Sequence, residues 1–198
     1  MSNSKQLKNW PSNVQYTAKL HYSLPNLCRL IQEEVDSDRT KPQVIHYQPQ
    51  SLVKIGSLKD FPNHPAYPHF GLFANKRIPP FTLILPYLGM VTPSNAADPS
   101  SDYCLGYYNH YAIDANKIGN EARFINDYRN VKDKPNVEFK EYIDKSSSQL
   151  MMGVFSTYKA IEKNEELLIN YGKGFWKSRG LLQDDPSDKY LEHGFDFN

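Results

Sequence analysis

The spacing of apolar residues predicts one amphipathic helix near the N-terminus of the chain. Apolar side chains recur there at intervals of three and four, at Leu27, Leu30, Ile31 and Val35. This spacing places them on one face of a helix. Either Ser23 or Asn26 can cap its start, and the intervening proline is tolerated in a first helical turn. The polar stretch 36–42 is expected to end the helix and act as a connector.

From residue 44 onward the pattern changes to short apolar runs rich in Val, Ile, Tyr and Phe, separated by turn residues. Such runs are typical of strands. We expect strands at 44–47, 52–55, 72–74, 81–85, 107–108, 111–113, 136–139, 149–152, 154–157 and 167–169. The proline-rich stretches 61–68 and 92–102 are expected to be surface loops, and 144–148 a turn. A short second helix is expected from Lys173 onward. The pattern therefore predicts a mainly β fold with short helices.

Composition and charge narrow the function classes. A chain of 198 residues suffices for one domain with a real core and a small subdomain. The net charge is +1, from 23 basic and 22 acidic residues. This balance argues against a protein whose main work is to coat nucleic acid or an anionic membrane. We therefore expect no direct nucleic-acid site and no membrane partner.

Cysteine and histidine usage argues against metal or disulfide chemistry. Cys28 and Cys104 lie far apart, which fits a reducing compartment and makes a disulfide scaffold or zinc cluster unexpected. The six histidines show no metal-ligand spacing, so no metal site is predicted. The N-terminus lacks an apolar signal segment, and no stretch approaches the ~18 to 20 apolar residues of a membrane helix. An intracellular, soluble protein is expected.

Three sequence fragments carry the candidate chemistry. They are His69-Phe70-Gly71-Leu72-Phe73-Ala74, Gly119-Asn120-Glu121-Ala122-Arg123-Phe124-Ile125-Asn126 and Glu165-Glu166-Leu167-Leu168-Ile169-Asn170-Tyr171-Gly172. Tyr87-Leu88-Gly89, Pro135-Asn136-Val137 and 154–161 lie between them. In this order, over roughly residues 68–176, the segments resemble the SET-domain family of protein (histone) lysine methyltransferases. The resemblance is to a fungal-type stand-alone SET protein without cysteine-rich zinc flanks.

The resemblance implies a SET-domain β-fold of small sheets with a C-terminal pseudoknot. In that fold the segment holding Tyr171 passes through a loop formed near Asn126, which brings two distant segments to one site. The expected organisation is an N-terminal flanking region with one helix (1–60), the SET domain (61–176) and a C-terminal tail that completes the site (177–198).

The resemblance also implies an activity. The methyl donor would be S-adenosyl-L-methionine, the product S-adenosyl-L-homocysteine, and the acceptor a lysine ε-amine, with a histone H3 tail as the expected protein substrate. The expected location is the nucleus, with the cytoplasm left open, and a homodimer is left open as well. Two alternatives remain, namely methylation of a non-histone protein and a catalytically silent peptide-binding module.

The chemistry requires a buried amine. A free lysine has a pKa of about 10.4, so deprotonation near pH 7 costs roughly 4 to 5 kcal/mol. A narrow apolar channel lowers that cost because burial disfavours the charged form, and it aligns the reacting atoms. Aromatic walls exclude water and attract a methylammonium or sulfonium cation through their faces.

The resemblance assigns the site residues. Tyr171 is the expected catalytic residue, orienting the amine rather than removing its proton, because a phenol with a pKa of about 10 is a poor base at neutral pH. The expected cofactor-binding residues are Gly71, Leu72, Phe73, Tyr103, Arg123, Asn126, Asp127, Phe175 and Trp176. The expected substrate channel is formed by Tyr107, Tyr108, Tyr171 and Trp176, although Tyr103, Tyr107 and Tyr108 compete for one position in the motif alignment.

Each assignment has a structural alternative. Tyr171 can simply end a strand, Gly71 and Asn126 can be turn residues, and Phe73 can be a core residue. Arg123 can pair with the cofactor carboxylate or with a local one. Phe175 and Trp176 can anchor the terminal helix.

The chain departs from the family pattern at three positions. His69 stands where the family often has glycine, Asp127 where it usually has histidine, and Asn170 where it has an acidic residue. These changes put the cofactor loop and cofactor affinity in question. The acidic residues Glu138, Glu141 and Asp144 favour a basic peptide substrate.

Overall fold

The computed structural model describes residues 7–177 and 179–180 of the 198-residue chain. In chain order its elements are β1 (Gln15–Tyr16), β2 (His21–Tyr22), α1 (Leu27–Ser37), β3 (Val44–Ile45), β4 (Val53–Ser57), β5 (Phe70–Ala74), β6 (Leu83–Pro86), β7 (Met90–Pro93), the 3-10 helix η1 (Ser94–Ala96), β8 (Cys104–Tyr107), β9 (Tyr111–Asp114), β10 (Ile118–Gly119), the 3-10 helix η2 (Glu121–Phe124), β11 (Asn126–Asp127), β12 (Val137–Asp144), β13 (Leu150–Ser156), β14 (Leu168–Ile169) and α2 (Lys173–Lys177). Within these residues no helix is long and apolar enough to cross a membrane.

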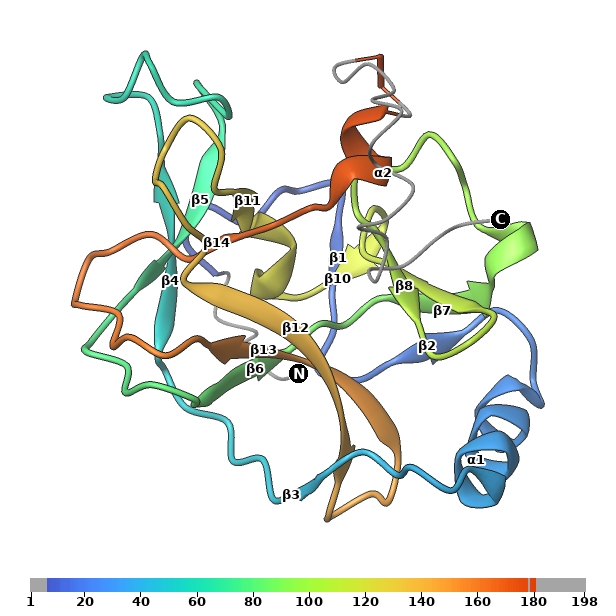
Figure 1. Ribbon diagram of the computed structural model, residues 1–198. Coiled ribbons are helices and arrows are strands. Elements are labelled where there is room, and N and C mark those ends of the chain that lie inside the picture. Colours follow the sequence, from blue (N-terminus) through green and yellow to red (C-terminus); the bar gives the residue numbers. More distant parts are fainter. Residues whose placement is uncertain (1–6, 178, 181–198) are drawn as a thin grey trace, which may run out of the picture.

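The described strands form several small sheets (Figure 1). Two sheets have four strands, in the orders β3-β12-β13-β6 and β2-β7-β9-β8, and the pairs β1-β10, β4-β5 and β11-β14 are two-stranded. The predicted mainly β fold of small sheets with short helices is confirmed.

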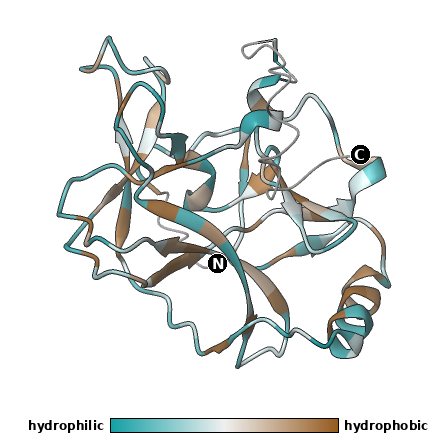
Figure 2. Cartoon of the chain, in the orientation of Figure 1, coloured by the Kyte–Doolittle hydropathy of each residue, from teal (hydrophilic) through white to brown (hydrophobic). Residues whose placement is uncertain are grey.

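Helix α1 packs one apolar stripe against the core. Leu27, Ile31 and Val35 are buried, and the helix contacts β13. Figure 2 shows apolar and polar colours on different sides of this helix. Leu30 is 42% exposed, so its predicted place on the buried face is wrong, because it lies about 100° around the helix from the row formed by the other three. Asn26 is the N-cap but makes no side-chain capping bond.

The longest strand pair, β12 and β13, differs from prediction in one respect. The two strands expected at 149–152 and 154–157 form the single strand β13, which runs antiparallel to β12 from Val137↔Ser156 to Ile143↔Leu150. Gly153 does not break it. A Cβ there would lie 2.6 Å from the Phe155 ring, so the glycine makes room for a packed aromatic.

The loop predictions hold in part. The stretch 61–68 is a loop between β4 and β5, and 144–148 is a turn whose Asp144 carboxylate accepts bonds from the Ser146 and Ser147 hydroxyls. The predicted loop 92–102 is wrong at its start, because its first residues belong to β7 and η1. Thr92 and Pro93 there pair with β9, which extends a sheet already formed by neighbouring apolar residues.

The N-terminal region is built into the sheets rather than standing apart. β1 pairs with β10, β2 with β7, β3 with β12, and β4 with β5. The expected domain boundary near residue 60 stays a prediction. Most of the expected C-terminal tail, 181–198, lies outside the described residues.

A parallel pair joins the two sequence regions that carry the motifs. Asn126 of β11 is in register with Leu168 of β14, and Asp127 with Ile169. Tyr171 follows β14 by two residues, so the chain reaches the Asn126 region from a distant part of the sequence, as the pseudoknot prediction requires.

Candidate functional site

Tyr171 lies against the segment that carries Asn126. Its hydroxyl donates a 2.7 Å hydrogen bond to the Ile125 carbonyl, and its backbone N–H donates a 2.8 Å bond to Asp127 Oδ2. Burial, and then the negative charge of Asp127, raise the pKa of the Tyr171 phenol. The phenol is therefore protonated at neutral pH, which suits an orienting group and not a base.

Three aromatic rings form a cluster where β14 leads into α2. The Phe175 ring centroid lies 4.6 Å from that of Tyr171, and the Trp176 ring stacks on Tyr171 at 6.3 Å with an interplanar angle of 23°. Trp176 Nε1 is buried and finds no hydrogen-bond acceptor in the described part of the chain. A buried indole N–H of this kind normally has a partner, so the cluster offers a donor to a ligand.

The carboxamide of Asn126 has a defined orientation. Its Nδ2 donates to Glu166 Oε1 at 2.9 Å and to the Phe70 carbonyl at 3.2 Å. Both partners are acceptors only, so the amide nitrogen must face them. The oxygen Oδ1 then faces the other way, as an acceptor that no described residue uses.

Gly71 is required by this packing. A Cβ at residue 71 would collide with Glu166 Oε1 and lie 3.2 Å from Asn126 Nδ2. His69, two residues earlier, is not among the positive-φ residues, so the position where the family often has glycine needs no glycine here.

Arg123 and Tyr103 form a second part of the site. The Arg123 guanidinium carbon lies 3.9 Å from the centroid of the Tyr103 ring, and Nε donates to the Ala115 carbonyl at 2.9 Å. Arg123 is only 8% exposed, and among the described residues no carboxylate forms an ion pair with it. Since buried charges are normally paired, this guanidinium suits an anionic ligand such as a carboxylate.

Asp127 binds the protein itself. Its carboxylate accepts from the Tyr171 N–H, and from the Arg129 N–H and Nη1 at 2.9 and 2.8 Å. The side chain is thereby committed to fixing the two segments rather than directed to a ligand. The Arg129 guanidinium in turn lies 5.9 Å from the Trp176 ring centroid, which links this pair to the aromatic cluster.

Four other predicted residues do not join this group. Leu72 is fully buried in the core, and the Phe73 ring covers Gly56 on the neighbouring strand. The Tyr107 hydroxyl donates to the Leu150 carbonyl at 2.7 Å, and the Tyr108 hydroxyl to Asp38 at 3.2 Å. Among the described residues, neither Tyr107 nor Tyr108 forms a hydrogen bond or a ring contact with Tyr171.

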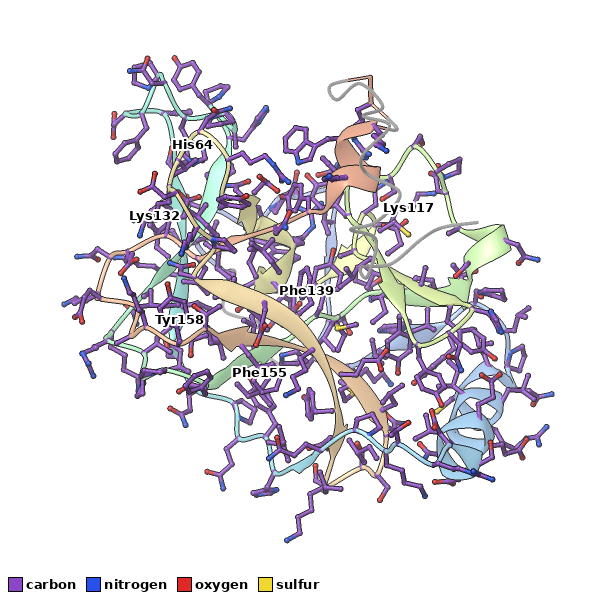
Figure 3. All side chains as sticks on the ribbon, viewed as in Figure 1. His64, Lys117, Lys132, Phe139, Phe155 and Tyr158 are labelled. Carbon is purple, nitrogen blue, oxygen red and sulfur yellow. The ribbon has the colours of Figure 1, made fainter. Side chains whose placement is uncertain are left out.

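Two aromatic residues that the sequence analysis did not select, Tyr87 and Phe139, pack against each other beside Tyr103. The Tyr87 hydroxyl donates to the Tyr103 carbonyl at 2.7 Å, and its ring meets Phe139 edge-on at 5.3 Å. Burial, and then the neighbouring Tyr171, raise the pKa of Tyr87. Phe139 lies near the centre of the view in Figure 3. The Tyr87-Leu88-Gly89 motif was a signal for the first residue, and nothing in the sequence singled out Phe139.

Buried amides hold these segments in place. The Asn120 carboxamide accepts from the Leu88 N–H and donates to the Pro86 carbonyl at 3.2 and 2.8 Å, so it fixes the backbone on both sides of Tyr87. The Asn136 carboxamide does the same for β14, through the Leu168 N–H and the Glu166 carbonyl, both at 2.8 Å.

A cavity of about 450 Å³ opens beside Phe139. It is lined by Asp38, Thr40, Pro42, Tyr108, Asn109, Phe139, Lys140, Glu141 and Met152. The Glu141 carboxylate accepts the Tyr108 N–H at 2.8 Å, and burial raises the pKa of this carboxyl. Three acidic residues were expected to favour a basic peptide. Glu141 lines this cavity, the Asp144 carboxylate accepts hydrogen bonds within the turn 144–148, and Glu138 is exposed.

Comparisons with known proteins identify the family of this chain. A sequence profile described as the SET domain matches residues 69–172. The chain is 31% identical over 120 residues to the human histone-lysine N-methyltransferase EHMT1, an alignment that covers 57% of this chain and 9% of that protein.

A solved structure is also similar. The crystal structure of KRYPTONITE in complex with mCHH DNA, H3(1-15) peptide and SAH shares 23% sequence identity, with 54% of this chain and 22% of that chain covered and a TM-score of 0.44. The chain thus spans a small part of the length of either relative. SET methyltransferases use S-adenosylmethionine as methyl donor. The profile match covers more than half of the sequence, and the chain belongs to the SET-domain family.

Proposed function

We propose that this chain transfers a methyl group from S-adenosylmethionine to the ε-amine of a lysine in a basic peptide, with a histone H3 tail as the substrate. The observation that carries the proposal is the meeting of Tyr171 with the Asn126 segment beside Phe175 and Trp176. The phenol that contacts this cluster thus meets the backbone of the segment that carries the oriented Asn126 carboxamide, although the two come from distant parts of the sequence.

The residues present fit the proposed cofactor. The buried Arg123 guanidinium suits its carboxylate, and Asn126 Oδ1 can accept from its ammonium group. The stacked rings of Tyr171 and Trp176, with the unsatisfied indole N–H, suit an aromatic base or a sulfonium. When bound, the cofactor supplies an electrophilic methyl group. Gly71, Tyr103 and Phe175 complete this proposed site, and Asp127 serves it indirectly by fixing Tyr171.

The proposed lysine channel is walled by Tyr87, Phe139 and Tyr171. Their rings exclude water, which lowers the pKa of an entering amine because burial disfavours its charged form. Tyr171 remains protonated and orients the nitrogen through its oxygen. This channel leaves out Tyr107 and Tyr108, whose hydroxyls are bound elsewhere.

A basic, extended substrate is supported by two surface features. β8 is an edge strand of its sheet, and an extended peptide can add to such an edge through main-chain hydrogen bonds. The cavity beside Phe139 carries the carboxylates of Asp38 and Glu141, which suit a basic side chain near the target lysine. The histone assignment rests on the name of the human relative, and it implies that the protein acts in the nucleus.

The test is mass spectrometry of an H3-tail peptide incubated with the protein and S-adenosylmethionine. We expect mass gains of 14 Da per methyl group on lysine, and none on a peptide whose lysines are replaced by arginine. Tyr171→Phe should reduce the rate by at least about 100-fold while S-adenosylhomocysteine still binds, because the variant keeps the stacked ring and loses the hydroxyl that orients the amine. Equal rates in the variant and the wild type would remove Tyr171 from the mechanism.

Binding separates the alternatives. If calorimetry detects peptide binding but no binding of S-adenosylmethionine or S-adenosylhomocysteine, the chain is a silent peptide-binding module. If the cofactor binds and no histone peptide is methylated, a lysine-containing peptide array tests the non-histone alternative.

A further inference from the structure

We propose that His64 is a positioning residue for the cofactor, which acts through Glu166 to hold the carboxamide of Asn126 in its binding orientation. This inference rests on the proposed function, because it concerns the same cofactor site. His64 lies before the residues that match the SET-domain profile, and the profile match alone gives it no role.

The loop between β4 and β5 turns the polar side chain of His64 inward. The His64 side chain is 7% exposed, whereas Phe61 and Tyr67 of the same loop are 54% and 46% exposed. Figure 3 labels His64 within this loop. Polar side chains are usually more exposed than aromatic ones, and here the imidazole is buried while two aromatic residues are exposed. The hydrogen-bond partners of His64 must therefore offset the cost of burying it.

Those partners fix the tautomer of His64. Nδ1 accepts the Ala66 N–H at 3.0 Å, so it carries no proton. The ring proton must then sit on Nε2, which lies 3.1 Å from Glu166 Oε2 and donates to it. The loop backbone thus presents His64 to Glu166 as a donor.

Glu166 connects His64 to Asn126 through its two carboxylate oxygens. Its Oε2 accepts from His64 and its Oε1 accepts from Asn126 Nδ2 at 2.9 Å, while the side chain is 8% exposed. The missing side chain of Gly71 provides the space that the carboxylate occupies. With both oxygens bound to the protein, Glu166 has one defined orientation, and a buried carboxylate that loses one of two partners is strongly driven to move.

The orientation of Asn126 matters for the ligand. While Nδ2 faces Glu166 and the Phe70 carbonyl, Oδ1 is available to accept from an ammonium group. If Glu166 moves away, the carboxamide can rotate and present its N–H donors to that cation. The contact from His64 therefore stabilises the binding orientation without touching the cofactor.

Two matched variants test this inference, since each keeps one half of the imidazole. His64→Gln keeps a donor at the Nε2 position, within reach of Glu166, and loses the acceptor for Ala66. His64→Asn keeps an acceptor near Nδ1 for Ala66 and cannot reach Glu166. Calorimetry of each variant with S-adenosylhomocysteine measures the dissociation constant directly.

We expect His64→Gln to bind within about threefold of wild type and His64→Asn about tenfold more weakly, which corresponds to about 1.4 kcal/mol. In an Asn126→Ala background, His64→Asn should cause no further loss. The reverse order of the two variants, or equal affinity for all, would overturn the proposal. So would an undiminished effect of His64→Asn in the Asn126→Ala background.

A measurement on the wild-type protein covers the case in which variants do not fold. Imidazole ¹⁵N chemical shifts should show His64 as the neutral Nε2–H tautomer at neutral pH, and the Nδ1–H tautomer would refute the inference. If the wild type binds no S-adenosylhomocysteine, the proposed function fails, and with it this role of His64. If the wild type binds and the variants behave alike, only the role of His64 fails.

Discussion

Removing the Asp127 carboxylate should destabilise the junction on which the site is built. Asp127 is 7% exposed and accepts three hydrogen bonds, one from the Tyr171 N–H and two from Arg129. The first joins segments forty-four positions apart in the sequence, and the other two hold the loop after β11. Asp127→Ala removes all three and leaves the Tyr171 N–H without an acceptor.

The expected loss in the free energy of unfolding follows from how deeply each hydrogen-bond partner of Asp127 is buried. A hydrogen bond to a charged acceptor contributes about 1.5 to 3 kcal/mol, and the Tyr171 bond belongs to this class. The Arg129 guanidinium is partly exposed and regains water, so its pair is worth at most about 1 kcal/mol, and the local N–H bond adds a similar amount. Avoiding burial of a carboxylate offsets part of the sum. We expect a net loss of about 3 kcal/mol in the free energy of unfolding.

Urea denaturation, followed by tryptophan fluorescence and by far-ultraviolet circular dichroism, measures this loss. Asp127→Asn keeps an acceptor oxygen and should lose about half as much. Asp133→Ala removes an exposed aspartate close by in the sequence and should stay within about 0.5 kcal/mol of wild type. If Asp127→Ala is no less stable than the Asp133 control, the Asp127 carboxylate does not hold the junction between the two segments.

Three further predictions concern packing, amide clamps and pH. Gly71→Ala should lower the free energy of unfolding by about 2 kcal/mol and weaken S-adenosylhomocysteine binding, because the new methyl group displaces Glu166. Gly174→Ala is the control in the same urea assay, because a Cβ at residue 174 has no atom within 4 Å. Asn120→Ala should cost about 2 to 3 kcal/mol in that assay, because two buried backbone groups beside Tyr87 lose their partner, and a loss below about 0.5 kcal/mol would contradict the clamp. Burial raises the pKa of the Tyr107 and Tyr171 phenols, so above about pH 10 the folded state keeps protons that the unfolded state loses. Their contribution to the free energy of unfolding is therefore fully present below about pH 10 and is lost as the pH rises above it. Absorbance at 295 nm that showed all 14 tyrosines ionising near pH 10 without unfolding would refute this.

The local parts of the fold were predictable because they depend on side-chain periodicity. The helix at 27–37 and most longer strands follow from apolar spacing. The strands β1, β2, β10 and β11 were missed because each has only two residues and exists through pairing with a distant partner. Leu30 was misplaced because an apolar residue at the margin of a stripe does not reveal which side of the helix meets β13.

The sequence motifs selected the residues of the candidate site. Tyr171 meets the segment that holds Asn126, and Arg123 meets Tyr103, while the roles that the resemblance implied for these four residues stay predictions. Tyr107 was assigned to the channel because it shares a tyrosine-rich segment with Tyr103. Its hydroxyl instead donates to the Leu150 carbonyl, a partner 43 positions away that no local pattern contains.

Phe139 and His64 illustrate a different limit. Phe139 looked like one more aromatic residue of a strand, and its position opposite Tyr87 depends on how β12 crosses the molecule (Figure 1). His64 sat in a proline-rich stretch that predicted only a loop. Its role arises from a carboxylate 102 positions away, which no local pattern contains.

The polar residues of the motifs explain how so short a strand pair can hold the site. β11 and β14 share only two register pairs, too few to stabilise a parallel pair in water. Side-chain bonds to the backbone of the partner segment supply the rest, from Asn136 to Leu168 and Glu166, from Asp127 to Tyr171, and from the Tyr171 hydroxyl to Ile125. The same phenol thus both fastens the crossing and faces the proposed reaction. Because these bonds exist only when both segments are in place, a ligand held between them binds the folded chain alone, so its binding must raise the free energy of unfolding with the logarithm of its concentration relative to Kd.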